Sequence, residues 1–166
     1  MKEEENDMME KAPAAPAPCT VATDRKVRLT LRKDEKLRHK SLVDPLFREG
    51  KSLYEFPLRL VWRMLTPEEL RESFRGELPG HIGKLQMLIT VPKKKRRHAV
   101  DRVLMRRRIR EAYRLWRKEL LADVAESAST GTLGMAFVYM HNENLPYSTI
   151  ERKMRSLLKK LAKGVG

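Results

Sequence analysis

The chain has 166 residues and a mass of 19.4 kDa, the size of a single domain with one modest core. Its formal charge of +14 and its sequence pI near 10.2 indicate a polyanionic partner, either nucleic acid or an anionic membrane face. The single cysteine, Cys19, excludes an internal disulfide and a thiolate metal cage, and no apolar run approaches the roughly 18 residues of a membrane span.

The first 26 residues differ in composition from the rest. Residues 1–12 carry a net charge of −3, and residues 12–18 alternate alanine with proline, which excludes regular helix. The acidic start has no apolar segment of the kind that a secretory signal needs, so we expect a cytoplasmic protein. We predict a disordered tail over 1–26 and one folded domain over 27–166. As an alternative role, the acidic segment shields a basic surface until a nucleic acid displaces it.

The first predicted element is a helix over Asp34–Glu49, where apolar side chains recur at helical spacing. Pro45 either kinks this helix or shortens its regular part, and Gly50 is a natural stop. A strand follows over 56–64, because apolar residues alternate there with Arg59 and Arg63. A basic face opposite an apolar one is typical of a half-exposed strand.

The middle of the chain predicts a loop and two more strands. Residues 66–83 are rich in glycine and proline, which favours a loop with one helical turn at Pro67–Ser73. Strands are expected over 84–91 and Thr132–Met140, since both alternate. One face of the later strand has only small side chains, which would leave a shallow open surface: Gly134, Ala136 and Val138.

Two amphipathic helices are predicted over Ala99–Leu121 and Tyr147–Ala162, each with an apolar stripe in steps of three and four. Ser148 and Glu151 have the spacing of a capping box at the start of the second helix. Trp62 and Trp116 fall on apolar faces and are expected in the core. The fold class is therefore α+β, a single domain with a small sheet of three to four strands packed with three helices.

Positive charge is concentrated in residues 91–118, which carry a net charge of +11. Cations recur at every fourth position of the predicted helix, with Arg107 and Arg117 flanking this row: Arg102, Arg106, Arg110, Arg114 and Lys118. The planar fork of arginine donates two hydrogen bonds at once, so such a row suits phosphates. The alternative, a solvated helix face, fits less well because such faces normally interleave both signs.

Several motifs together resemble the bacterial ribonuclease P protein component, in the form found in the Bacteroidetes branch. The resemblance covers about residues 29–163 and lies in these segments: Leu31–Leu37, Leu46–Lys51, Leu88–Lys95, Ala99–Arg102, Arg106–Arg114 and Leu145–Ser148. The chain departs from the family where its Arg-Asn-Arg signature falls on Arg102-Val103-Leu104. Val43 also stands where an aromatic residue is usual.

The resemblance implies a ribonuclease P protein-like fold, a ribosomal-protein-like α/β sandwich. It implies a protein subunit that binds a catalytic RNA and the 5′ leader of precursor tRNA, so that the leader is removed endonucleolytically. The residues expected to bind the catalytic RNA are Lys93, Lys94, Lys95, Arg96, Arg97, Arg102, Arg106, Arg107, Arg110 and Arg114. The residues expected to line the leader cleft are Phe47, Arg59, Gln86 and Thr90.

The resemblance also implies that Mg²⁺, bound mainly by the RNA, handles the scissile phosphate. We expect no catalytic residue, metal site or small-molecule substrate in the protein, because a two-metal nuclease needs several convergent carboxylates. Asp101 and Glu111 are scattered on a basic helix and are expected to pair with arginines within it. The alternative functions are a non-catalytic, ribosomal-type structural RNA-binding protein and, less favoured, a protein-only nuclease.

Overall fold

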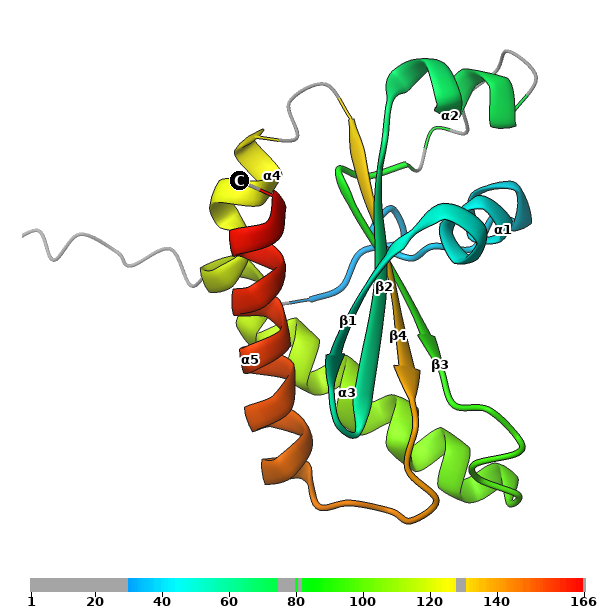
Figure 1. Ribbon diagram of the computed structural model, residues 1–166, viewed down its shortest axis with the longest axis vertical. Coiled ribbons are helices and arrows are strands. Elements are labelled where there is room, and N and C mark those ends of the chain that lie inside the picture. The colour runs from blue at the N-terminus through cyan, green and yellow to red at the C-terminus, as the bar shows by residue number, and fades with distance from the viewer. Residues whose placement is uncertain (1–29, 75–79, 81, 128–130, 166) are drawn as a thin grey trace, which may run out of the picture.

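The computed structural model describes residues 30–74, 80, 82–127 and 131–165, so the predicted tail lies outside the described residues. The described chain forms a four-stranded sheet in the order β1-β2-β4-β3, with helices on both faces (Figure 1). The strands are β1 (Lys51–Glu55), β2 (Leu58–Leu65), β3 (Leu85–Thr90) and β4 (Thr132–Tyr139). The first three in sheet order pair antiparallel, and β3 pairs parallel with β4. This confirms the predicted α+β class.

One face of the sheet is covered by α3 (Ala99–Leu120) and α5 (Tyr147–Val165). The register places Leu60, Phe137 and Ile89 in one row beneath these helices. The predicted stripe of α5 is fully buried there: Ile150, Met154, Leu157, Leu158 and Leu161. Each buried side chain of this size stabilises the fold by about 1.5–3 kcal/mol relative to exposure, so this face holds most of the core.

The other face carries α1 (Lys40–Glu49), whose Leu42 and Leu46 are buried against Val61 and Ala136. Gly50 ends α1, as predicted, although its φ of −69° is not left-handed. The glycine is required by close approach, because a Cβ there would collide with the Leu46 carbonyl. Pro45 lies inside the helix, which continues past it, with Leu42 before the proline and Leu46 after it buried in the core.

The predicted start of the first helix at Asp34 is wrong. Residues 33–36 form a turn that lies against the outer edge of β3: the Leu37 amide donates to the Met87 carbonyl at 3.0 Å, and the Met87 amide donates to the Glu35 carbonyl at 2.8 Å. We call residues 30–37 the strap. Leu37 is buried, as its periodicity suggested. Its backbone, however, forms hydrogen bonds with the edge of β3 instead of with a helical turn.

Two short helices flank these layers. The predicted turn at Pro67–Ser73 is confirmed as α2, and a capping box closes its start: Glu69 N–H donates to Thr66 Oγ1 at 3.3 Å and Thr66 N–H donates to Glu69 Oε2 at 2.9 Å. The sequence analysis did not anticipate α4 (Ala122–Ser127) or β1. Both are short, so their patterns contain too few repeats to stand out.

The predicted capping box at Ser148 is wrong, because α5 already begins at Tyr147. The Glu151 carboxylate instead accepts a hydrogen bond from the Trp116 indole at 3.0 Å, and the Arg155 guanidinium lies 4.3 Å from the centre of that ring. Trp116 is therefore a partly exposed link between α3 and α5, whereas Trp62 is buried as predicted.

Candidate nucleic-acid interface

The predicted cationic residues divide into two groups in the structure. One group is exposed to solvent, on the turn before α3 and along α3 itself: Lys93, Lys94, Arg97, Arg106, Arg107 and Arg110. The other group is partly covered: Lys95, Arg96, Arg102 and Arg114. We call the exposed group the cationic surface.

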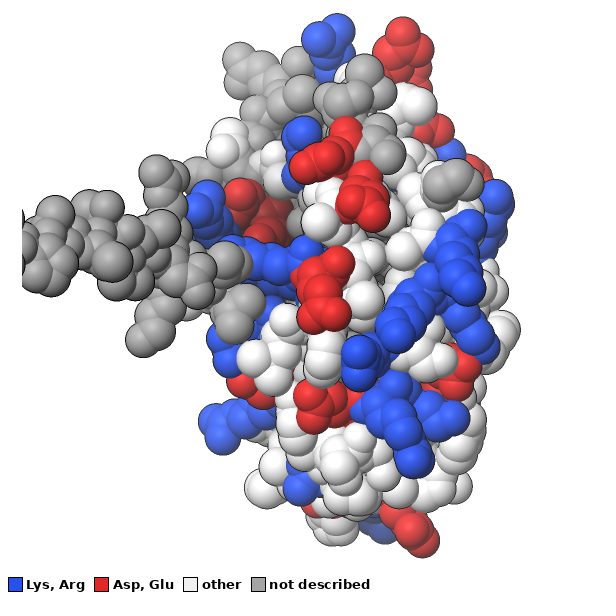
Figure 2. All heavy atoms as spheres, turned by 90° about the vertical axis from the view of Figure 1, so that its left-hand side faces the viewer, with Lys and Arg blue, Asp and Glu red and all other residues white. Residues whose placement is uncertain are grey.

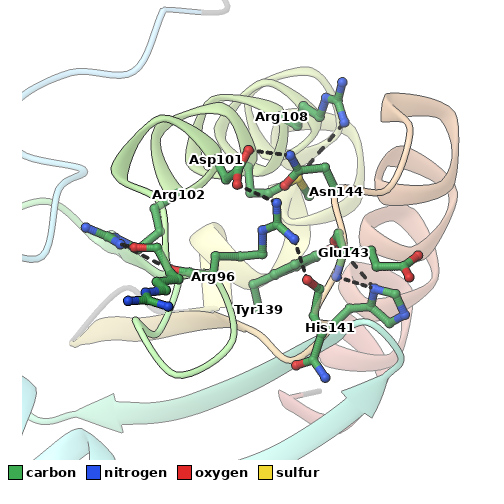
Figure 3. A network of polar contacts seen from close by, with 11 residues as sticks. Arg96, Asp101, Arg102, Arg108, Tyr139, His141, Glu143 and Asn144 are labelled. Atoms are coloured by element: carbon green, nitrogen blue, oxygen red, sulfur yellow. Dashed lines mark hydrogen bonds and ion pairs between the residues drawn. The ribbon is translucent and has the colours of Figure 1, made fainter.

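Some of the partly covered arginines belong to a network of polar contacts that braces the start of α3 (Figure 3). Arg96 forms an ion pair with Asp101 at 2.6 Å and donates a hydrogen bond to the Asn142 carbonyl. The Asn144 amide donates to the other Asp101 oxygen at 2.7 Å. These contacts join the basic turn to the β4–α5 loop. The hydrogen bond from Asn144 and the charge of Arg96 lower the pKa of Asp101.

Two further arginines bind backbone carbonyls. Arg102 donates to the carbonyls of Arg96 and Arg97 at 3.0 and 2.6 Å, and Arg108 donates to the Leu145 carbonyl. Arg96 and Arg102 were expected to contact RNA, but the structure uses their guanidinium groups to hold the turn. The predicted intrahelical pairing is wrong for Asp101, whose partner lies in the turn, and is confirmed for Glu111, which pairs with Arg114 at 2.5 Å.

A groove of about 780 Å³ runs along the outer edge of β3, between the strap and α3. The α3 side is lined by Arg106, Arg107 and Arg110 together with the Glu111–Arg114 ion pair, and Lys36 and Arg38 lie on the opposite side. The floor is apolar and comes from β3: Met87, Leu88 and Ile89. A cationic groove with an apolar floor accommodates a phosphate backbone together with the flat faces of its bases.

Arg117 holds the strap against α3. Its side chain is 4 % exposed, forms an ion pair with Glu35 and donates a hydrogen bond to the Thr30 carbonyl at 2.8 Å. The prediction that it flanks the exposed row is therefore wrong. Tyr113 is also buried here, and this burial raises the pKa of its hydroxyl.

The second candidate surface is the part of the sheet that α1 leaves uncovered. Pairing places Tyr54, Arg59, Val138 and Thr90 in one row across the four strands. Tyr54 is 60 % exposed, and the Arg59 guanidinium lies 5.3 Å from the centre of its ring. Arg59 also donates to Ser52 Oγ at 3.0 Å. An exposed ring beside a cation is the combination that grooves for single-stranded nucleic acid use.

The predicted cleft residues reach this surface unequally. Phe47 is 45 % exposed on α1, so it is not a core residue. Gln86 lies on the same sheet face but is fully buried, and its amide donates to the Asp34 carbonyl at 3.3 Å. It does not line an open cleft, and Ala136 is likewise covered by α1. Tyr54, which lies on this surface, was not among the residues predicted from the sequence.

On the helical side of the molecule, some lysines are paired with a carboxylate of the protein. Lys and Arg lie close to Asp and Glu on the face where α4 and α5 are found (Figure 2). Glu55 of β1 pairs with Lys160 at 2.5 Å and Lys153 at 3.3 Å, and accepts a hydrogen bond from Ser156 at 3.1 Å. These contacts, chiefly the one with Lys160, lower the pKa of Glu55 to about 2.

Two further observations concern the described ranges alone. Within residues 30–74, 80, 82–127 and 131–165, no group of three or more His, Cys, Asp or Glu side chains is placed to hold a metal ion. In the same part of the chain, no helix is long and apolar enough to cross a membrane. Two histidines make local contacts: His39 packs edge-on against Phe74 with ring centres 4.9 Å apart, and His141 packs edge-on against Phe56 at 5.3 Å.

The fold and the two surfaces define a basic α+β protein of the nucleic-acid-binding class. The family model of ribonuclease P matches residues 31–162, which is most of the chain. The chain therefore belongs to the ribonuclease P protein family. Among relatives, it is 33 % identical over 135 residues to the ribonuclease P protein component of Porphyromonas gingivalis strain W83, covering 81 % of this chain and 88 % of that protein. A second strain of that species gives 34 % over the same coverage.

Solved structures agree on the fold. The RNase P protein of Staphylococcus aureus superimposes with a TM-score of 0.52 at 15 % identity, covering 80 % of this chain and 98 % of that one. The RNase P protein from Thermotoga maritima gives a TM-score of 0.53 at 21 % identity, covering 76 % and 96 %. The fold expected from the sequence resemblance is confirmed, and the resemblance to this family is confirmed with it.

Proposed function

We propose that this chain, as the protein subunit of ribonuclease P, binds the catalytic RNA of the holoenzyme through its cationic surface. The observation that carries this proposal is the wall of exposed arginines over the groove: Arg106, Arg107 and Arg110. No acidic side chain interleaves with these three, and the nearby Asp101 and Glu111 are held by Arg96 and Arg114. Each arginine therefore remains available to a phosphate.

The row on the open sheet face binds the single-stranded 5′ leader of precursor tRNA. Phe47 and Tyr54 offer exposed rings for stacking, while Arg59 and Thr90 offer polar groups to the backbone. This surface lies on the α1 side of the sheet, and α3 packs on the other side, so the two RNAs do not compete for the same side chains.

Hydrolysis at the leader junction is assigned to Mg²⁺ ions bound mainly by the RNA, in the cytoplasm. Support for this assignment comes from how the described carboxylates are used: Asp101, Glu111 and Glu55 each hold a basic side chain of the protein instead of converging on one point. A ribosomal-type structural role explains the charge equally well but not the family membership.

A reconstitution experiment tests the proposal. The purified protein is mixed with the ribonuclease P RNA from the same genome and a labelled precursor tRNA, and cleavage is followed at low Mg²⁺, where such an RNA alone is slow. We expect strong stimulation and tighter binding of precursor than of mature tRNA. A folded protein that binds RNA without stimulating cleavage would contradict the subunit role and favour the ribosomal-type alternative.

Single substitutions test the leader surface. Phe47→Ala and Tyr54→Ala should each weaken precursor binding about five- to 150-fold, since stacking on one base is worth about 1–3 kcal/mol, with mature tRNA bound as before. Phe56→Ala is the matched control, because this ring is 62 % exposed but packs against His141 outside the row. An unchanged preference for precursor in the folded variants would remove the sheet face from the leader site.

A further inference from the structure

The first half of α3 exposes an aliphatic facet in the midst of its positive charge. Val100, Val103 and Leu104 are 79 %, 39 % and 37 % exposed. Their spacing of three and four places all three on one side of the helix. The other large exposed hydrophobic residues of the described chain are aromatic: Phe47, Tyr54 and Phe56. We call Val100, Val103 and Leu104 the aliphatic facet.

The surroundings of the facet are cationic. Arg97 precedes it in the turn, and Arg106 and Arg107 follow it within one helical turn, all exposed. The carboxylate of this stretch, Asp101, already binds Arg96 and Asn144 and adds no free negative charge. Two copies of this chain meeting facet to facet would bring these arginines against each other, so charge repulsion opposes self-association. A polyanion that also offers an apolar face matches both properties.

We propose that the aliphatic facet packs against the face of an unpaired nucleobase of the catalytic RNA, while the arginines beside it hold the neighbouring phosphates. This inference rests on the proposed function and adds a contact of another kind to it. Unpaired bases in RNA expose flat faces that pack on side chains, whereas paired bases bury those faces in the stack.

The two kinds of contact respond differently to salt. A phosphate contact releases counterions, so each one lost reduces the slope of log affinity against log salt by about 0.7–0.9. An apolar contact releases no counterions and leaves this slope unchanged. Loss of the aliphatic facet should therefore weaken RNA binding by the same factor at every salt concentration.

The test measures the affinity of the full chain for the ribonuclease P RNA from the same genome across a salt series. Val103→Thr with Leu104→Gln keeps the size and charge of the facet but makes it polar, and should weaken binding about ten-fold without changing the slope. Val103→Ile with Leu104→Met is the matched control and should bind like the parent protein. Arg107→Gln is the comparison for a phosphate contact and should lower the slope.

Val100→Thr provides a second variant that cannot disturb the core, since Val100 is 79 % exposed; it should lose less affinity, again without a change of slope. Unchanged affinity of both polar variants would overturn the inference. So would a loss accompanied by the lower slope of Arg107→Gln, or a change in sedimentation of the protein alone, which would make the facet a self-association surface. If the folded parent protein fails to bind the RNA, the proposed function falls, and this inference falls with it.

Discussion

Helices α3 and α5 lie next to each other on one face of the sheet, and both are rich in cations, but they use them differently. On α5, Lys153 and Lys160 pair with one carboxylate, Glu55 of the neighbouring strand. On α3 and the turn before it, Arg96, Arg102 and Arg108 bind backbone carbonyls, and other arginines remain exposed. The comparison teaches that a count of cations does not locate an RNA-binding surface until the partners of each one are known.

The largest expected effect comes from the one α3 arginine that is almost fully buried. Arg117→Met should destabilise the protein by about 3 kcal/mol, because Glu35 and the Thr30 carbonyl lose their partner in a covered site. Urea unfolding measures the change. Arg117→Lys is the control, since it keeps the positive charge but removes the planar guanidinium group. We expect a loss of stability smaller than that of Arg117→Met. If the Arg117→Met variant and the parent protein are equally stable, the strap is not held by this contact.

A smaller effect, on binding alone, is expected for the exposed arginines. Arg106→Ala with Arg110→Ala should lower the slope of log affinity against log salt by about 1.5 and weaken RNA binding at low salt at least ten-fold. The melting temperature should stay close to that of the parent protein, because both side chains are exposed. Lys159→Ala with Lys163→Ala removes the same charge from α5 and is the matched control. If both pairs lower the slope equally, the difference between the two helices is not functional.

The smallest effect is expected at the carboxylate that serves α5. Glu55→Gln should cost about 1 kcal/mol of stability at neutral pH. The pKa of Glu55 is lowered from 4.5 to about 2, mainly by Lys160, so its contribution is fully present above pH 4.5 and disappears as the pH falls towards 2. The free energies of unfolding of the parent protein and the variant should therefore converge over this pH range. A constant difference between them down to pH 2 would contradict the ion pair.

The sequence predicted the elements that bury a periodic stripe, because periodicity is a property of neighbouring residues. The helices over Ala99–Leu120 and Tyr147–Val165 match their expected ranges closely at the start. The burial of Arg117 was not predictable in this way, since the carbonyl that it binds lies 87 residues earlier in the chain. Gln86 was placed on the correct face of β3, but its burial depends on the strap crossing the sheet edge, which no local pattern of the strand encodes.

The candidate interface shows the same limit. Charge density located the basic turn and α3, and the exposed α3 arginines that line the groove were among the predicted residues, whereas Arg38 on the opposite side was not. Some arginines form hydrogen bonds within the protein and others stay exposed. This division depends on loop carbonyls such as that of Asn142, which lies 46 residues after the arginine that it binds. Tyr54 was missed because its strand is only five residues long, too short for alternation to be distinctive.

The strap has a consequence for how the chain is made. Its Thr30 carbonyl is bound by a side chain 87 residues later, and its pairing with β3 also waits for residues near Met87. During synthesis the strap leaves the ribosome long before any of these partners exist, because chains are made from the amino terminus at about 5–20 residues per second. Long-range closure of this kind is slow. The edge of β3 and the groove beside it are therefore completed late, after α3 has been translated.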